Sequence, residues 1–360
     1  MRSGKVNIER KTMKSNKISD KIKAYRGKDA PKGMITQANI EDHREKTIES
    51  AKKYKYPMQQ AKHIILITAA VVAVVAAAVF VVVSWLQLYT AQTTSNFYYT
   101  ATKVIPLSVA NVDGEPVNYG GYLRRVRASV HYLEGQENRD FSTEDGEREL
   151  VHTKRVNLDE AEKAAYAAKI AREKNMTVTN DEIQENIKAT LNSKDGDTIS
   201  ERAFENSLWR YYGWTLDDYR QIVRERLTIQ KAAFAVDSKA TTKINNIKTQ
   251  LDTGADFADV AKSESEDEST KSNGGDVGVI SVNSVDDDGL IATAKSLEVG
   301  QVSGIIKGVD AYYIIKLTGK NDTGIQYSVI KVALTEFSSQ FDSLREQGKI
   351  QEYIEINEEE

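Results

Sequence analysis

The sequence predicts an α+β protein with one N-terminal membrane-spanning helix. Three observations support this class. An uninterrupted apolar run occupies residues 64–83, apolar residues recur at helical spacing through residues 105–237, and strand patterns with glycine-containing turns follow residue 238. The sequence therefore divides into a membrane segment, a mostly helical region and a region that contains a small sheet.

The apolar run Ile64–Val83 contains one polar residue, Thr68. At about 1.5 Å per residue, its twenty residues span a hydrocarbon core of about 30 Å. Trp85 and Tyr89 follow, where aromatic rings favour the headgroup level. A cleaved signal peptide is the alternative. It fits poorly, because a long basic arm precedes the run and no A-x-A-like cleavage site follows closely. We therefore expect a transmembrane helix over residues 63–86 and a polar spacer over 87–104.

Charge is distributed unevenly along the chain. Residues 1–62 hold 17 Lys and Arg against 7 Asp and Glu, a net charge of +10. Because the whole chain has a formal net charge of −4, the remaining residues carry −14. Lysines before the apolar run place the N-terminus in the cytoplasm and the later domains outside it. We interpret residues 1–62 as a disordered arm that orients the chain and touches anionic lipid, and we expect no nucleic-acid partner. The absence of cysteine excludes disulfides and thiolate chemistry.

Residues 105–237 begin with a strand pair about the turn Asp113-Gly114. A helix is expected next, then a loop over 138–148 and a helix over 157–174. Two further helices follow the capping residues Thr179 and Thr215, with another over 200–212 between them. Four aromatic residues near Gly213 have the helical spacing typical of a core, and a peptide-binding cleft is the alternative: Trp209, Tyr211, Tyr212 and Trp214.

The opening strand pair, Val109-Ala-Asn-Val-Asp-Gly-Glu-Pro-Val117, resembles the "VA.VNGE.I" start of SurA-like and PrsA-like folding factors. The resemblance covers about residues 105–236. It implies a helical, chaperone-like domain.

A second resemblance depends on a series of short motifs. Gly254-Ala-Asp-Phe257, Ser265-Glu-Asp267, Gly274-Gly-Asp-Val-Gly278, Gly300-Gln-Val-Ser303 and Ala311-Tyr-Tyr-Ile-Ile-Lys-Leu317 stand in the order and spacing of the parvulin family of peptidyl-prolyl isomerases. The resemblance implies an antiparallel sheet with flanking helices over 238–334, followed by a C-terminal helix and acidic tail over 335–360. It also implies prolyl isomerisation without a cofactor.

Rotation about a peptide bond faces a barrier of about 18–20 kcal/mol, so a catalyst must stabilise the twisted amide with polar groups beside an apolar pocket. Carried over from the family motifs, the catalytic positions fall on Asp267, Asp310 and Tyr313. The proline pocket falls on Val277, Ile280, Val285 and Leu290. Ser303 matches a motif and is interpreted as structural.

The family's opening strand, "S-H-I-L-V", has no counterpart before Lys239. Residues 326–334 contain Ser-Val-Ile-Lys-Val, which overlays that strand and puts Val329 at its histidine. We therefore hypothesise a permuted sheet whose C-terminal strand replaces the first. The chain's histidines are His43, His63, His131 and His152, so the family's two catalytic histidines are absent from residues 238–334.

Two acidic clusters, residues 264–268 and 286–288, lack the ligand spacing of a calcium loop and are interpreted as solvated loops, so no metal is expected. Two functions remain open. The chain is either a membrane-tethered, bacterial-type isomerase that acts on exported, proline-containing polypeptides, or a holdase or scaffold that keeps the parvulin fold without efficient catalysis.

Overall fold

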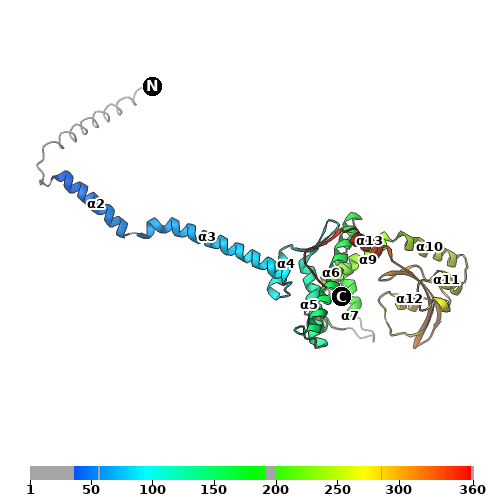
Figure 1. Cartoon of the computed structure of the whole chain (residues 1–360). Coiled ribbons are helices and arrows are strands. Elements are labelled where there is room, and N and C mark those ends of the chain that lie inside the picture. The colour runs from blue at the N-terminus through cyan, green and yellow to red at the C-terminus, as the bar shows by residue number, and fades with distance from the viewer. Residues whose placement is uncertain (1–35, 56, 192–198, 285, 358–360) are drawn as a thin grey trace, which may run out of the picture. The chain divides into compact units, whose positions relative to one another are not determined.

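The structure, a computed structural model, describes residues 36–55, 57–191, 199–284 and 286–357. The chain divides into two compact units, Met1–Val81 and Val82–Glu360. Figure 1 shows the order of the helices and strands along the chain. Each unit is described by itself.

The first unit contains α2 (Gln37–Lys55) and most of α3 (Pro57–Trp85). The expectation of disorder does not hold for α2, which is a solvent-exposed helix with an Asp42–Lys46 ion pair of 3.0 Å one turn apart. Residues 1–35 of the predicted arm lie outside the described residues. Among the residues that are described, one helix, Ile64–Thr90, is long and apolar enough to cross a membrane.

The second unit opens where α3 passes into a π-helical turn, η1 (Leu86–Thr90), and then into α4 (Asn96–Val104). The prediction of a polar spacer over residues 87–104 is therefore wrong, because this segment is folded. Leu88 and Thr102 are buried, and Tyr98 and Tyr99 pack against the same core. The segment folds because its aromatic and apolar residues find partners there, although its threonines and serines give it the composition of a linker.

A three-stranded antiparallel sheet has the order β2-β1-β7. The predicted pair is β1 (Ser108–Val112) and β2 (Glu115–Asn118), joined through Asp113 and Gly114, both with positive φ. The third strand, β7 (Ile350–Glu352), was not predicted and comes from the other end of the sequence. The C-terminal segment therefore returns to the N-terminal sheet.

α5 (Tyr119–Gln136) and α6 (Glu144–Glu173) pack on this sheet. α8 (Glu201–Tyr212) packs on α5, α9 (Leu216–Val236) packs on α6, and α7 (Asn180–Leu191) and α13 (Glu336–Glu346) pack on α9. The predicted capping residues Thr179 and Thr215 form their capping hydrogen bonds. The predicted loop over 138–148 is wrong in its second half, because Thr143 caps α6 and three acidic residues favour its first turn. Phe337, Phe341 and Ile354 complete the core of this region.

The second sheet has the order β3-β6-β5-β4, from β3 (Asp276–Ser281), β6 (Gly324–Ala333), β5 (Ala311–Lys320) and β4 (Ile306–Lys307). The permuted sheet is confirmed. β6 pairs antiparallel with β5 from Ala311↔Ala333 to Lys320↔Ile325, and with β3 on its other side. The late strand therefore lies beside the strand that carries the final family motif.

The two faces of this sheet are covered by different elements. Tyr312, Ile314 and Ile330 face α10 (Ser238–Asp252) and α11 (Phe257–Glu264). Tyr313, Ile315 and Val329 face the opposite side and pack with α12 (Leu290–Ser296). We call this second side the site face, because alternation along β5 and β6 puts the predicted site residues Tyr313 and Val329 on it.

The chain crosses between the two sheets twice, and one buried carboxylate joins the crossings. Asp237 is 2% exposed, and it accepts hydrogen bonds from the backbone N–H groups of Ala240 at 2.8 Å and Thr335 at 2.8 Å. It also accepts one from Glu336 at 3.1 Å. Asp237 thereby caps α10 and the start of α13 together.

Candidate functional site

Three of the four predicted pocket residues, Val277, Ile280 and Leu290, lie in one apolar cluster on the site face with Tyr313. The fourth, Val285, lies outside the described residues. Val329, predicted at the position of the family's first histidine and as a substrate contact, lies in the same cluster. The structure therefore brings these predicted contacts together, although they come from β3, α12 and β6.

Val277 and Ile280 are three residues apart, and strict alternation would place them on opposite faces of β3. A register shift between Asp276 and Val279 corrects this, with Gly278 at φ +80° inside it. Such a bulge adds one residue to a strand and re-aims the next side chain. Both residues consequently join the site-face cluster, while Val279 is exposed.

The Gly274-Gly275 pair permits β6 to lie where the family's opening strand would lie. Gly275 has φ +83°, and a Cβ atom there would lie 2.3 Å from the Val329 carbonyl oxygen. The Val329 N–H donates to the Gly275 carbonyl at 2.8 Å. A glycine is required because the two backbones approach more closely than any side chain allows.

Tyr313 is held by an aspartate that the sequence analysis assigned to a solvated loop. The Tyr313 hydroxyl donates to Asp288 at 3.1 Å, and Asp288 also accepts from the Val309 N–H at 2.7 Å. Burial, reinforced by the nearby Asp288 charge, raises the pKa of Tyr313. The hydroxyl is therefore a neutral donor at physiological pH, and the solvated interpretation of Asp288 is wrong.

Asp286, in the same acidic run, is likewise structural. It accepts hydrogen bonds from the backbone N–H groups of Leu290 at 2.8 Å and Ile291 at 2.7 Å, and so holds the start of α12. The sequence signal for this role was an aspartate four residues before a short apolar helical pattern.

Asp267 lies at the edge of the site face in a tight turn. Its carboxylate accepts from the Ser269 hydroxyl at 2.7 Å and the Thr270 hydroxyl at 2.7 Å. Burial opposes ionisation, but these hydrogen bonds and the charge of Lys331 together lower the pKa of Asp267. Asp267 is thus an ionised, positioned carboxylate and not a proton donor near neutral pH.

Lys331 is the residue that sequence reasoning missed. It is the cross-strand partner of Tyr313, its Nζ lies 5.8 Å from the Tyr313 ring centre, and it stands 3.8 Å from the exposed Asp310 carboxylate. Its charge also acts on Asp267. Lys331 therefore links the three predicted catalytic residues, and it occupies the apolar fourth position of the family's opening strand.

The site face offers polar groups but little space in this structure. Tyr313 is 6% exposed, Leu290 is 8% and Val329 is 3%. A proline ring can enter only if these side chains or the loop before α12 move apart. Once there, the Tyr313 hydroxyl and the Lys331 ammonium are donors suited to a twisted amide, and no nucleophile is needed.

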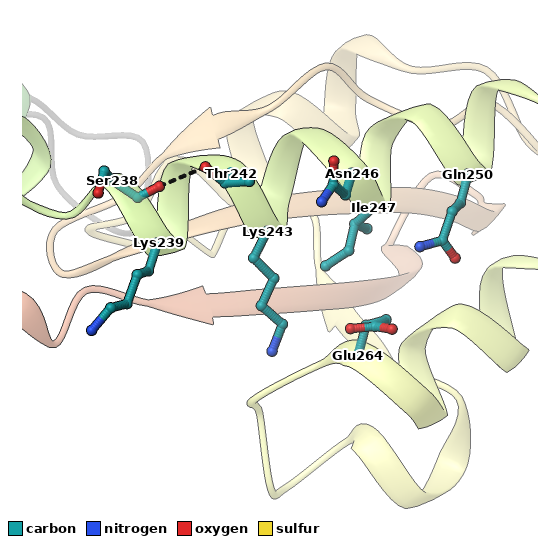
Figure 2. A pocket seen from close by; sticks show the side chains of 8 residues that line it. All are labelled: Ser238, Lys239, Thr242, Lys243, Asn246, Ile247, Gln250 and Glu264. Carbon is teal, nitrogen blue, oxygen red and sulfur yellow. Dashed lines mark hydrogen bonds between the residues drawn. The ribbon is translucent and has the colours of Figure 1, made fainter.

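A groove of about 470 Å³ lies along α10, close to the same sheet (Figure 2). Figure 2 shows Lys239 and Lys243 pointing down from α10, with Lys243 on the side of Glu264 of α11. Lys239 pairs with Glu336 at 3.1 Å and Lys243 with Glu266 at 2.7 Å. This groove is polar and cross-linked by ion pairs, so it does not have the character of a proline pocket.

A second cleft, of about 440 Å³, lies in the helical region. Tyr212 forms its centre, stacked on Tyr132 at 6.1 Å and on Trp214 at 5.0 Å. We call this the aromatic cleft. Apolar and polar side chains complete its lining, namely Ala128, Leu133, Val156 and Ile222 with Arg125, Ser129, Glu137, His152, Thr153 and Asn157. The prediction of core positions is wrong for Trp209, Tyr211 and Tyr212, which are all exposed, because α8 buries Leu208 instead.

Within the described ranges, no group of three or more His, Asp or Glu side chains is placed to hold a metal ion.

Comparison with known families agrees with this architecture. Residues 227–319 match the family described as the PPIC-type PPIASE domain, and residues 57–233 match the SurA-like N-terminal domain. The chain therefore carries a parvulin-type peptidyl-prolyl isomerase domain next to a SurA-like N-terminal domain. The first match ends before β6 begins, so the structure adds a strand that the family match does not contain.

The similar proteins are foldases. The chain is 43% identical over 76 residues to "Foldase protein PrsA 2" of Bacillus anthracis and 30% identical over 118 residues to "Foldase protein PrsA" of Clostridium kluyveri. These matches cover 21% and 32% of the chain, and 26% and 34% of the two relatives. A match to "Foldase protein PrsA" of Caldanaerobacter subterraneus subsp. tengcongensis is 26% identical over 272 residues, covering 69% of the chain and 87% of that protein.

Proposed function

We propose that this chain is a membrane-anchored, extracytoplasmic folding factor that acts on exported, proline-containing polypeptides as a peptidyl-prolyl isomerase. α3 is the anchor, and the lysines before its apolar run keep the N-terminus in the cytoplasm. The parvulin-type domain supplies isomerisation through Asp267, Asp310 and Tyr313, with Val277, Ile280, Val285, Leu290 and Val329 as its apolar contacts.

One observation carries this proposal. The late strand β6 restores the sheet around the family motifs, so that Tyr313, Val329 and the β3 residues share one face although the usual opening strand is missing. The bulge of β3 and the close approach at Gly275 make this shared face possible. Tyr313 and Lys331 then provide the donors in place of the family's histidines.

A holdase is the second candidate, and the aromatic cleft favours it. The site face is closed by its own side chains, whereas Tyr212 and its stacked neighbours already present aromatic surface to solvent. Exposed apolar surface of this kind commonly marks a binding site. As a holdase, the chain holds its client in the aromatic cleft, and the parvulin-type domain contributes little catalysis.

The test is prolyl isomerisation by the intact chain in phospholipid nanodiscs, followed by exchange NMR on a short proline peptide. An acceleration over empty nanodiscs that falls several-fold in Tyr313→Phe supports the isomerase. A rate equal to that of empty nanodiscs, together with suppressed aggregation of an unfolded client, decides for the holdase.

A further inference from the structure

α4 is firmly held by the folded body on one side. The Tyr99 hydroxyl donates to the buried Asp218 carboxylate at 2.8 Å, and Thr102 is buried where its carbonyl closely approaches Gly120. Arg127 of α5 donates to Asn96 at the start of the helix. α4 therefore cannot turn about its own axis without breaking buried contacts.

The other side of α4 is apolar and exposed. Phe97 is 60% exposed, Val104 is 82% and Ile105, which follows the helix, is 52%. Phe97 and Val104 are seven residues apart, so they lie on the same side of the helix two turns from each other. A nine-residue helix with buried contacts on one side thus shows large apolar side chains on the opposite side.

The short connection from the end of α3 to α4 is also fixed. Trp85 and Leu86 are exposed, but Leu88 is buried, and its carbonyl accepts a hydrogen bond from Tyr119. Further on, Gln92 donates to the Glu355 carbonyl at 2.6 Å. Buried contacts of the folded body therefore begin within three residues of Trp85.

We propose that the outward side of α4, with Phe97, Val104 and Ile105, rests in the headgroup region of the bilayer that α3 crosses. This inference depends on the proposed membrane anchor. The lipid surface is the partner because the apolar side continues a segment that is itself lipid-facing, after a connection of few residues. Headgroup layers extend the bilayer from about 30 Å to about 40–45 Å, which gives a shallow apolar helix a place to lie.

The chain contains no cysteine, so single-cysteine variants of the full chain can be labelled cleanly. We would label Val104→Cys with an environment-sensitive fluorophore in phosphatidylethanolamine–phosphatidylglycerol vesicles, with and without lipids that carry a nitroxide just below the headgroup. Val299→Cys is the matched control, because it is also an exposed valine, 62%, in a loop of the parvulin-type domain. Flotation of the labelled vesicles tests the anchor separately.

We expect the chain to float with the vesicles and nitroxide lipid to quench the label at position 104 at least three-fold more than at position 299. Failure to float would overturn the anchor itself. Flotation with equal, weak quenching at both positions would overturn the placement of α4 alone. Weak quenching at position 104, together with a disulfide formed under mild oxidation between two unlabelled Val104→Cys chains, would assign this side to a second copy and also overturn the proposal.

Discussion

The two surfaces that could bind an unfolded polypeptide differ in how accessible their side chains are. The site face of the parvulin-type domain is covered by its own side chains and by the Tyr313–Asp288 hydrogen bond. The aromatic cleft of the SurA-like domain is open, and its central ring, Tyr212, is 39% exposed. The first surface must move to accept a proline, whereas the second can bind without rearrangement.

This difference separates affinity from catalysis. Binding to a preformed apolar cleft costs less than binding that must first displace packed side chains. We therefore propose that the cleft supplies the main affinity for client chains, and that the site face engages a prolyl bond only while the client is held.

The largest effect is expected from Gly275→Ala on the closed surface. A methyl group at this position meets the Val329 carbonyl at 2.3 Å, so β6 must shift, at a cost of roughly 3 kcal/mol or more. Hydrogen exchange should then show that residues 325–332 lose their protection. Gly278→Ala is the control, because it has a similar φ but open space around its Cβ position, and should cost only about 1–2 kcal/mol. Equal loss of protection in the two variants would contradict the close fit of β6.

A pH effect is expected where the C-terminal segment closes the domain that carries the cleft. Glu162 is fully buried and accepts a hydrogen bond from Arg345 of α13 at 2.8 Å. Burial raises the pKa of Glu162 to about 7; the charge of Glu352 also raises this pKa, and Arg345 lowers it. The folded state thus holds this proton more tightly than the unfolded state, so the free energy of unfolding should fall as pH rises from about 4.5 to about 7.

Glu162→Gln should remove most of this pH dependence and stabilise the domain above pH 7 by roughly 1–3 kcal/mol, as measured by urea unfolding of the intact chain. Glu160→Gln, on the surface of the same helix, is the control and should leave the slope unchanged. A Glu162→Gln protein that is less stable than the parent at pH 8 would show that the pair with Arg345 outweighs the cost of burial.

On the open surface, Tyr212→Ala should weaken binding of an unfolded, apolar peptide about ten-fold, because a central aromatic side chain commonly contributes about 1–2 kcal/mol to an interface. Fluorescence anisotropy of a labelled peptide measures this. Tyr211→Ala is the control, since Tyr211 is equally exposed, 38% against 39%, but does not line the cleft. Similar losses in the two variants would mean that the cleft has no special role.

The smallest effect is expected from Tyr313→Phe. Removing one hydrogen bond should cost about 1 kcal/mol of stability, and Tyr312→Phe should cost the same, because Tyr312 bonds Thr241 at 3.0 Å on the opposite face. Only Tyr313→Phe should slow isomerisation. Equal isomerisation rates in both variants would remove Tyr313 from the catalytic set.

Local signals in the sequence predicted much of the fold. The capping residues Thr179 and Thr215, the Asp113-Gly114 turn and the late strand were read correctly, because each depends on neighbours in the chain. The folded structure of residues 87–104 and the strand β7 were not predicted, because their partners lie far away in the sequence: Gln92 binds Glu355 and β7 pairs with β1. No local pattern carries that information.

The candidate site could be predicted only in part. Family motifs located Asp267, Asp310 and Tyr313, but the residues that organise them, Asp288 and Lys331, have no motif of their own. Asp288 stands in an acidic run with the composition of a solvated loop, and its bond to Tyr313 depends on a loop that folds back over 25 residues. Lys331 became visible only once β6 was paired with β5.

Hydrogen exchange of the intact chain in nanodiscs, with and without an unfolded, proline-containing client, tests the contrast between the two surfaces most directly. The account predicts added protection at residues 128–133 and 212–214, around the aromatic cleft, with weaker and slower protection on β5 and β6. Protection confined to residues 311–317 and 325–332, with none around the cleft, would contradict it.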